Sequence, residues 1–186
     1  MARFRGGDET AFEAIFRKYQ TPVFNVVHRM VRGESAYDLT QEVFLKAYRS
    51  LRGFRGESKL STWLFTIARH TCLNHLRHLK VLPETSLDTD LEEGGGWEPI
   101  DGGLPVDRIP ELRELQDAVD RVLSTLPPGA RLMLILRDFE QLSYDDISRV
   151  TEVSIANVKS RIHRARQLFR KRFEPWMELI EGSVVR

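Results

Sequence analysis

The sequence predicts an all-α protein made of two small helical domains joined by a flexible acidic linker. Apolar residues recur with helical periodicity through residues 8–80 and again through residues 111–173, and the first half shows no strand-like alternation. Between them, residues 81–110 contain four prolines, five glycines and eight acidic side chains against one basic one, a composition that favours a linker without helix. The predicted parts are residues 1–80, the linker 81–110, a second domain 111–175 and a tail 176–186.

The net charge of +1 conceals a basic–acidic–basic layout. Residues 1–80 hold 14 basic and 7 acidic side chains, and the basic side chains of the second domain crowd toward its end. Such a layout indicates contact with nucleic acid. The single cysteine, Cys72, permits no internal disulfide and no cysteine zinc site. The lack of a long apolar run or an apolar N-terminal segment predicts a soluble, cytoplasmic protein without membrane insertion.

The first domain is expected to begin with two short helices. Asp8–Tyr19 has a plausible cap at Asp8 and an apolar face. Pro22 fits the first turn of a second helix, from Thr21 to about Arg32, which Gly33 ends.

A third helix is predicted over Ala36–Leu51, with two faces of different character. Ala36, Leu39, Val43, Ala47 and Leu51 form the core side. The other side presents Asp38, Gln41, Glu42, Lys46 and Arg49 around Leu45. A single exposed leucine is ordinary on a protein surface, but an apolar centre with a polar rim is also typical of a protein interface. Spacing alone leaves both interpretations open.

After a glycine- and arginine-containing loop, Arg52–Lys59, a long helix is expected from Ser58 or Ser61 to about Lys80. Its core side is lined by Leu60, Leu64, Ile67, Ala68 and Thr71. A polar stripe of Thr66, His70, Asn74 and Arg77 is bordered by Trp63 and Arg69. Aromatic, amide and cationic side chains on one stripe are typical of surfaces that stack and hydrogen-bond unpaired bases. The alternatives are core packing for Trp63 and a solvated surface histidine for His70.

The second domain is expected to contain four helices. The first runs from Glu111 to Leu126 and is stopped by Pro127-Pro128, and the second is Arg131–Glu140. A short capped helix after Ser143 and a basic helix from Ser154 to Phe173, closed by Pro175, stand at helix-turn-helix distance.

The basic helix has seven Lys or Arg residues and no acid between Ser154 and Phe173. Its predicted buried stripe is Ile155, Val158, Ile162, Ala165 and Phe169, and its opposite face carries Ser160, His163, Arg164, Gln167 and Lys171. A polar, cationic helix face suits the major groove of DNA, where Arg and Lys read guanine. A solvated basic helix explains the charge run alone equally well.

Several motifs together resemble the extracytoplasmic-function sigma factors of the sigma-70 family. Region 2 of that family is similar to three stretches of this chain: 38–44 (DLTQEVF), 54–58 (FRGES) and 62–69 (TWLFTIAR). Region 4 is similar to 142–147 (LSYDDI) and 158–166 (VKSRIHRAR). The resemblance covers nearly all of both helical halves, in the right order.

The resemblance implies a promoter-specificity subunit that binds core RNA polymerase, reads promoter DNA and catalyses nothing itself. The implied polymerase contacts, with the clamp helices of the largest subunit, are Asp38, Gln41, Glu42 and Leu45; region 4 is expected to meet the flap. The implied −10 contacts are Phe54, Arg55, Ser58, Lys59, Trp63, Arg69, His70, Asn74 and Arg77. The implied −35 contacts are Arg149, Asn157, Lys159, Ser160, Arg161, His163, Arg164 and Arg166. No cofactor or metal is implied. Proteins of this family are often held inactive by an anti-sigma factor, although no residue here identifies one.

Some residues depart from the family pattern. His70 replaces the common Asn, and Asn157 replaces the usual Thr at the start of the recognition helix. Thr151-Glu152 stands where the family usually has a turn that contains Gly. Glu152 is therefore expected to take a backbone conformation that is unfavourable for a residue with a side chain.

Two other functional classes compete with the sigma-factor interpretation. A stand-alone helix-turn-helix regulator would bind its site without polymerase, typically as a dimer on a palindrome. An enzyme would use Asp38 and Glu42 as an acid pair, but the sequence adds no nucleophile, phosphate loop or further ligand to them.

Overall fold

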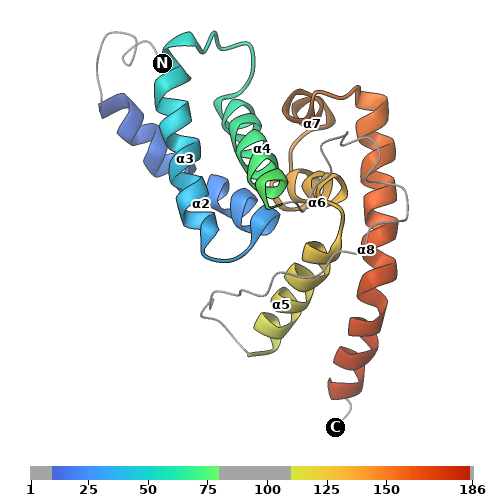
Figure 1. Ribbon diagram of the computed structural model, residues 1–186. Helices are drawn as coiled ribbons and strands as arrows, with labels where there is room; N and C mark the ends of the chain where they lie inside the picture. Colours follow the sequence, from blue (N-terminus) through green and yellow to red (C-terminus); the bar gives the residue numbers. More distant parts are fainter. Residues whose placement is uncertain (1–9, 80–109, 185–186) are drawn as a thin grey trace.

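The computed structural model describes residues 10–79 and 110–184, with side chains for 11–79 and 115–176. The all-α prediction is confirmed, since every element of the described ranges is a helix or a helical turn (Figure 1). The first half contains α2 (Thr10–Val31), α3 (Ser35–Ser50), the 3₁₀ turn η1 (Leu51–Gly53) and α4 (Leu60–His78). The second half contains α5 (Pro110–Thr125), α6 (Pro128–Leu134), the π-helical turn η2 (Ile135–Phe139), α7 (Tyr144–Thr151) and α8 (Ile155–Val184). The predicted linker and Trp97 lie outside the described residues.

The two helices predicted on either side of Pro22 are in fact one, α2, with Pro22 inside it. A proline within a helix removes a hydrogen bond and costs about 3 kcal/mol. Val23, Val26, Val27 and Met30, just beyond it, are completely buried, and each contributes roughly 1.5–3 kcal/mol. Packing of one continuous apolar face therefore outweighs the local break, and residues 10–79 contain three α-helices where the sequence predicted four. The predicted end at Gly33 is confirmed, where φ is +82°.

Helices α2, α3 and α4 pack on one another around the first half of the core. The predicted core side of α3 is buried in full: Ala36, Leu39, Val43, Ala47 and Leu51. On α4, Leu64, Ala68, Cys72, Leu73 and Leu76 are buried. The α4 helix begins at Leu60, so Ser58 and Ser61 do not cap it; the capping position is Lys59.

In the second half, α5 ends at Thr125, just before Pro127-Pro128, as predicted. Helix α6 begins at Pro128, earlier than the predicted Arg131, because a proline in the first turn loses no helical hydrogen bond and already has a helical φ. The helix-turn-helix is formed by α7 and α8, whose start at Ile155 follows the predicted cap.

Pro175 does not close α8, which continues to Val184. The guanidinium of Arg121, on α5, lies 5.8 Å from the ring centroid of Trp176, immediately beyond the proline. Arg172 donates to the carbonyl of Thr125 at the end of α5. Contacts with α5 on both sides of Pro175 thus favour one continuous helix over the tail expected from residue 176 onward.

The two halves pack against each other. Helix α4 lies beside α7, and α2 packs on α5 and α6 (Figure 1). Their buried apolar side chains form one cluster that includes Met30 and Leu76 from the first half and Leu126 and Ile147 from the second. Within the described ranges, no helix is long and apolar enough to cross a membrane.

Candidate nucleic-acid interface

The outward face of α3 carries the four candidate polymerase contacts together. Asp38, Gln41 and Glu42 are exposed, and Leu45 retains 57% of its accessible surface. Glu42 forms an ion pair with Lys46 (2.6 Å), whose Nζ also donates to Thr71 Oγ1 on α4 (3.1 Å). This face is therefore an exposed apolar centre with a polar rim.

The loop before α4 places Phe54 against Trp63, with ring centroids 5.1 Å apart. Both rings are half-buried. Gly56 turns the loop with φ +79°, and Arg55 is exposed. Ser58, which is half-buried, donates to the carbonyl of Lys59 (3.3 Å). The two rings form one aromatic corner beside the exposed cation Arg55.

The polar stripe of α4 is only partly free. His70, Asn74 and Arg77 are exposed, and Arg77 donates to Asn74 Oδ1 (2.9 Å). Arg69, expected to border the exposed stripe, is instead buried, with 6% of its surface accessible. Desolvation lowers the pKa of its guanidinium, while the nearby charge of Glu152 raises it. Glu152, a residue of the second half, lies 3.7 Å from Arg69 Nη1.

Two serines cap the helices of the helix-turn-helix as predicted. The backbone N–H of Asp146 donates to Ser143 Oγ (3.1 Å), and that of Asn157 donates to Ser154 Oγ (3.3 Å). Between them Glu152 has φ +62° and ψ +27°, which confirms the predicted left-handed backbone. The turn is held further by Ser148 Oγ, which donates to the carbonyl of Val153 (2.5 Å).

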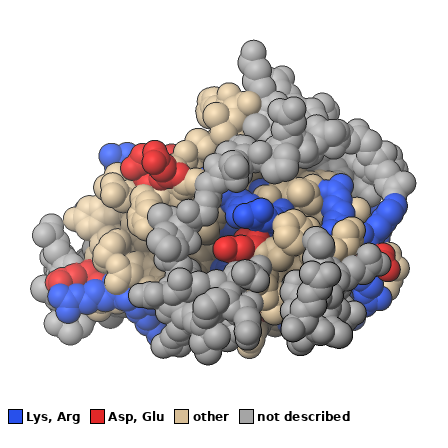
Figure 2. All heavy atoms as spheres, turned by 90° about the horizontal axis from the view of Figure 1, so that it is seen from below, with Lys and Arg blue, Asp and Glu red and all other residues tan. Residues whose placement is uncertain are grey.

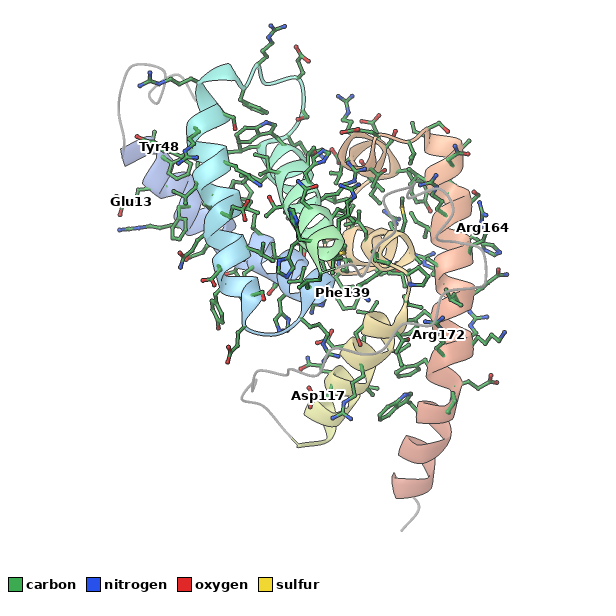
Figure 3. The ribbon with its side chains drawn as sticks, viewed as in Figure 1. Glu13, Tyr48, Asp117, Phe139, Arg164 and Arg172 are labelled. Carbon is green, nitrogen blue, oxygen red and sulfur yellow. The ribbon has the colours of Figure 1, made fainter. Side chains whose placement is uncertain are left out.

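The outer face of α8 presents a row of exposed polar and basic side chains: Asn157, Lys159, Ser160, His163 and Arg164. Figure 3 shows Arg164 on the side of α8 that is turned away from the other helices. Its Nη2 donates to Ser160 Oγ (3.1 Å), which orders both side chains. Seen from below, Lys and Arg side chains lie at the left end, at the centre and on the right of the visible face (Figure 2).

The remaining residues of α8 follow the predicted stripe with one exception. Val158, Ile162 and Ala165 are buried and Phe169 is half-buried, but Ile155, the first residue of the helix, is 43% exposed.

Two basic candidates on α8 are partly engaged within the protein. Arg161 is half-buried, and desolvation, followed by the nearby charge of Arg164, lowers its pKa. Arg166 binds Asp138 through Nε (3.1 Å) and Nη2.

Several candidates meet across the boundary between the two halves. The Asp146 carboxylate accepts hydrogen bonds from Lys59 Nζ (2.7 Å) and Thr62 Oγ1 (3.0 Å). Glu152 lies 3.3 Å from His70 Nε2 and 3.7 Å from Arg69 Nη1. The sequence predicted no role for Asp146 or Thr62. Acidic residues are common in the first turn of any helix because they stabilise its N-terminus. The two acids after Ser143 therefore do not, by themselves, indicate a contact between the two halves.

Comparisons with known proteins assign the family. Residues 15–81 match the family described as sigma-70 region 2, and residues 116–169 match sigma-70 region 4. The chain is 38% identical over 178 residues to the RNA polymerase sigma-H factor of Pseudomonas aeruginosa, covering 93% of this chain and 91% of that protein. It is 36% identical over 177 residues to the ECF RNA polymerase sigma-E factor of Escherichia coli K12, covering 93% and 92%.

Solved structures agree in fold. CnrH in complex with the cytosolic domain of CnrY matches with a TM-score of 0.67 at 20% identity, covering 94% of each chain. The sigma factor RpoE of Bartonella quintana, in complex with the anti-sigma factor NepR, matches with a TM-score of 0.62 at 24% identity, covering 88% of this chain and 97% of that one. The chain belongs to the sigma-70 family and is a sigma factor of the extracytoplasmic-function type.

Proposed function

We propose that this protein, as a non-catalytic subunit of RNA polymerase, directs promoter-specific initiation by reading a −10 and a −35 element. The observation that carries the proposal is a pair of separate exposed surfaces, one on each half. The outer face of α3 has an apolar centre and a polar rim, and the outer face of α8 is cationic. A protein interface on one domain and a major-groove surface on the other are the parts that such a subunit needs.

The α3 face is the surface for the clamp helices of the polymerase, and region 4 is the part that meets the flap. Exchanging Gln41 and Glu42 together for alanine removes part of the polar rim and should weaken binding to core polymerase about tenfold or more, which corresponds to about 1.4 kcal/mol. Glu13→Ala is the matched control, because Glu13 is an exposed acid on α2 that pairs only with its neighbour Arg17 among the ion pairs described. Unchanged assembly of the double variant in a pull-down would remove this surface from the proposal.

The α8 face is the −35 surface, with Lys159, Ser160, His163 and Arg164 at its centre. A lost base contact costs about 1–3 kcal/mol, so Arg164→Ala should lower transcription roughly 5- to 150-fold while polymerase binding stays intact. Arg170→Ala, a change at an exposed cation outside the proposed contacts, is the control. Loss of polymerase binding by the Arg164 variant would contradict the assignment.

The aromatic corner of Phe54 and Trp63 and the exposed part of the α4 stripe form the −10 surface. An aromatic ring beside cationic side chains suits an unpaired base, because stacking contributes about 1–3 kcal/mol per base and every base has a face to stack. Trp63→Ala should therefore reduce open-complex formation more than it reduces binding to the −35 element.

A gel-shift with and without core polymerase tests the function as a whole. We expect promoter binding only when polymerase is present, because two weak contacts become strong when they are held at fixed spacing. Tight binding by the protein alone, as a dimer on a palindrome, would favour a stand-alone helix-turn-helix regulator. An anti-sigma factor is a further partner, supported by the Bartonella quintana structure, which is a complex with a protein of that class.

A further inference from the structure

Asp138 lies in the π-helical turn η2 and reaches across to the recognition helix α8. The turn is π-helical because the Glu140 N–H donates to the carbonyl of Ile135, five residues earlier (3.0 Å). Such turns are rare and are frequent at functional sites. Arg166 Nε donates to Asp138 Oδ2 (3.1 Å) and its Nη2 donates to Oδ1, so the guanidinium and the carboxylate form a two-armed pair. This hydrogen bonding raises the pKa of Arg166 above its ordinary value.

Arg166 leaves α8 on a different side from the residues proposed to contact bases. Consecutive residues of an α-helix are about 100° apart around its axis, so Arg166 points about 160° away from Arg164. Ile162, about one turn before Arg166, is buried. Arg166 therefore stands at the edge of the buried stripe, whereas Arg164 is turned away from the other helices (Figure 3).

A second contact on the same side of α8 involves Lys159. It precedes Arg166 by seven residues, or about two turns, so the two side chains share a side of the helix. Lys159 Nζ lies 5.8 Å from the ring centroid of Tyr144 on α7, and the Arg137 guanidinium of η2 lies 4.8 Å from the same centroid. Cations within about 6 Å of an aromatic centroid are attracted to the ring. Polar contacts with η2 and α7 thus hold α8 at two points.

These directional contacts restrict a motion that apolar packing alone permits. Burial of apolar surface is not directional, so a helix packed only through its apolar stripe can turn slightly about its axis. With its side chains an α-helix has a radius of about 5–6 Å, and a turn of about 10° moves the end of an outer side chain by about 1 Å. N–H···O distances span only about 0.5 Å, from about 2.7 to 3.2 Å. The rotation of α8 therefore decides whether Arg164 can hydrogen-bond a base edge.

We propose that Asp138 is a positioning residue for the −35 surface: by holding Arg166 it fixes the rotation of α8 and so the direction of Arg164. This inference rests on the −35 function proposed for the outer face of α8. Arg166, which the family resemblance implied as a −35 contact, then acts within the protein instead of on DNA. The side chains of Arg166 and Asp138 are 50% and 36% exposed, and exposed ion pairs contribute little to stability. Loss of the pair should therefore change DNA reading and leave the fold intact.

Transcription by the holoenzyme from two promoters measures the positioning. One promoter is selected by the unaltered holoenzyme from a randomised library, and the other differs from it only in a replaced −35 element. We expect Asp138→Asn to lower the ratio of the two activities about fivefold, because the best exposed ion pairs contribute an energy of that order. Asp117→Asn, the same change at an exposed acid on α5 (Figure 3), is the control. Both variants should melt within about 2 °C of the unaltered protein.

Three further variants separate positioning from a direct contact with DNA. Asp138→Glu keeps a carboxylate within reach of Arg166 and should retain most of the ratio. Arg166→Ala should lower the ratio as much as Asp138→Asn does, and combining these two changes should lower it no further. An arginine bound to a phosphate behaves differently. Its loss reduces the salt dependence of promoter affinity by about one unit of slope, and loss of its acidic partner tightens binding to both promoters.

The outcomes distinguish this proposal from the proposed function. A ratio that Asp138→Asn leaves unchanged overturns the positioning role, and so does a reduced salt dependence in Arg166→Ala or tighter binding to both promoters in Asp138→Asn. The −35 function of α8 would fail in another way, with equal transcription of both promoters by the unaltered holoenzyme or with a ratio that Arg164→Ala does not change.

Discussion

Arg131 offers the sharpest test of how the two halves are held together. Its side chain is 3% exposed, and its guanidinium donates to the carbonyls of Met30 (2.6 Å), Leu126 (3.0 Å) and Ser124. These carbonyls belong to the last turns of α2 and α5 and to the residue just after α5, where helices leave acceptors without an intrahelical donor. One buried cation therefore caps two helix ends, one from each half.

The expected effect of Arg131→Ala is a difference between two terms. Hydrogen bonds to a charged group contribute about 1.5–3 kcal/mol each, or roughly 4.5–9 kcal/mol for three. Against them stands the burial of the charge: desolvation, followed by the nearby charge of Arg32, lowers the pKa of Arg131 to about 10. At about 1.4 kcal/mol per pKa unit, a shift of this size corresponds to roughly 3 kcal/mol of destabilisation that alanine relieves. The net loss is roughly 1–6 kcal/mol, with a central value near 3 kcal/mol.

Thermal melting of the full chain measures this loss. For a chain of this size, a loss of about 3 kcal/mol lowers the melting temperature by roughly 6–12 °C. Arg131→Lys, which keeps the charge but not the fork of donors, should lose less than Arg131→Ala. Arg121→Ala, at an exposed arginine over Trp176, should cost about 1 kcal/mol or less. A melting temperature for Arg131→Ala within about 2 °C of the unaltered protein would refute the capping argument.

Three further predictions concern single groups. Glu152→Gly and Glu152→Ala both lose the contacts with α4, but only glycine accepts φ +62° without strain. The glycine variant should therefore be more stable than the alanine variant by about 1 kcal/mol in urea unfolding. Equal unfolding midpoints would mean that the turn stores no strain. Because the folded pKa of Asp146 lies below its ordinary 3.8, the stability that it contributes is present above that pH and is lost as pH falls through the lower folded value. The difference in unfolding free energy from Asp146→Asn should therefore shrink below about pH 4, and a constant difference would contradict the charge-based account. The thiol of Cys72, buried and with a pKa raised to about 12, should react with a thiol reagent only on unfolding; rapid labelling of the native protein would contradict its burial.

The sequence predicted correctly those features that depend on interactions between residues close together in the chain. The serine caps at Ser143 and Ser154, the glycine end of α2 and the buried side of α3 are confirmed, because each depends on residues only a few positions apart. The two internal prolines, Pro22 and Pro175, were misjudged for the opposite reason. Their helices continue because side chains before and after each proline pack on distant parts of the chain.

The candidate site shows the same division. The exposed faces of α3 and α8 follow from helical periodicity, so their residues could be predicted. The packing of α7 on α4 determines the burial of Arg69 and the pairing of Asp146 with Lys59. The sequence of either half alone does not indicate how these two helices pack. An acid near the start of a helix is already accounted for by its interaction with the helix dipole. The sequence therefore gives no sign that Asp146 also contacts α4.

The continuation of α8 past Pro175 gives the proposed DNA-binding end of this helix a remote point of support. The helix has 30 residues, which corresponds to about 45 Å, and a packed helix behaves as a rigid rod on that scale. Its first turns carry the proposed base contacts, whereas Arg172 and Trp176 fasten its later turns to α5. A small rotation of α5 would therefore be transmitted along the rod and change the direction of the side chains proposed to contact the −35 element. The position of α5 thus becomes a way to set the angle of the proposed −35 surface.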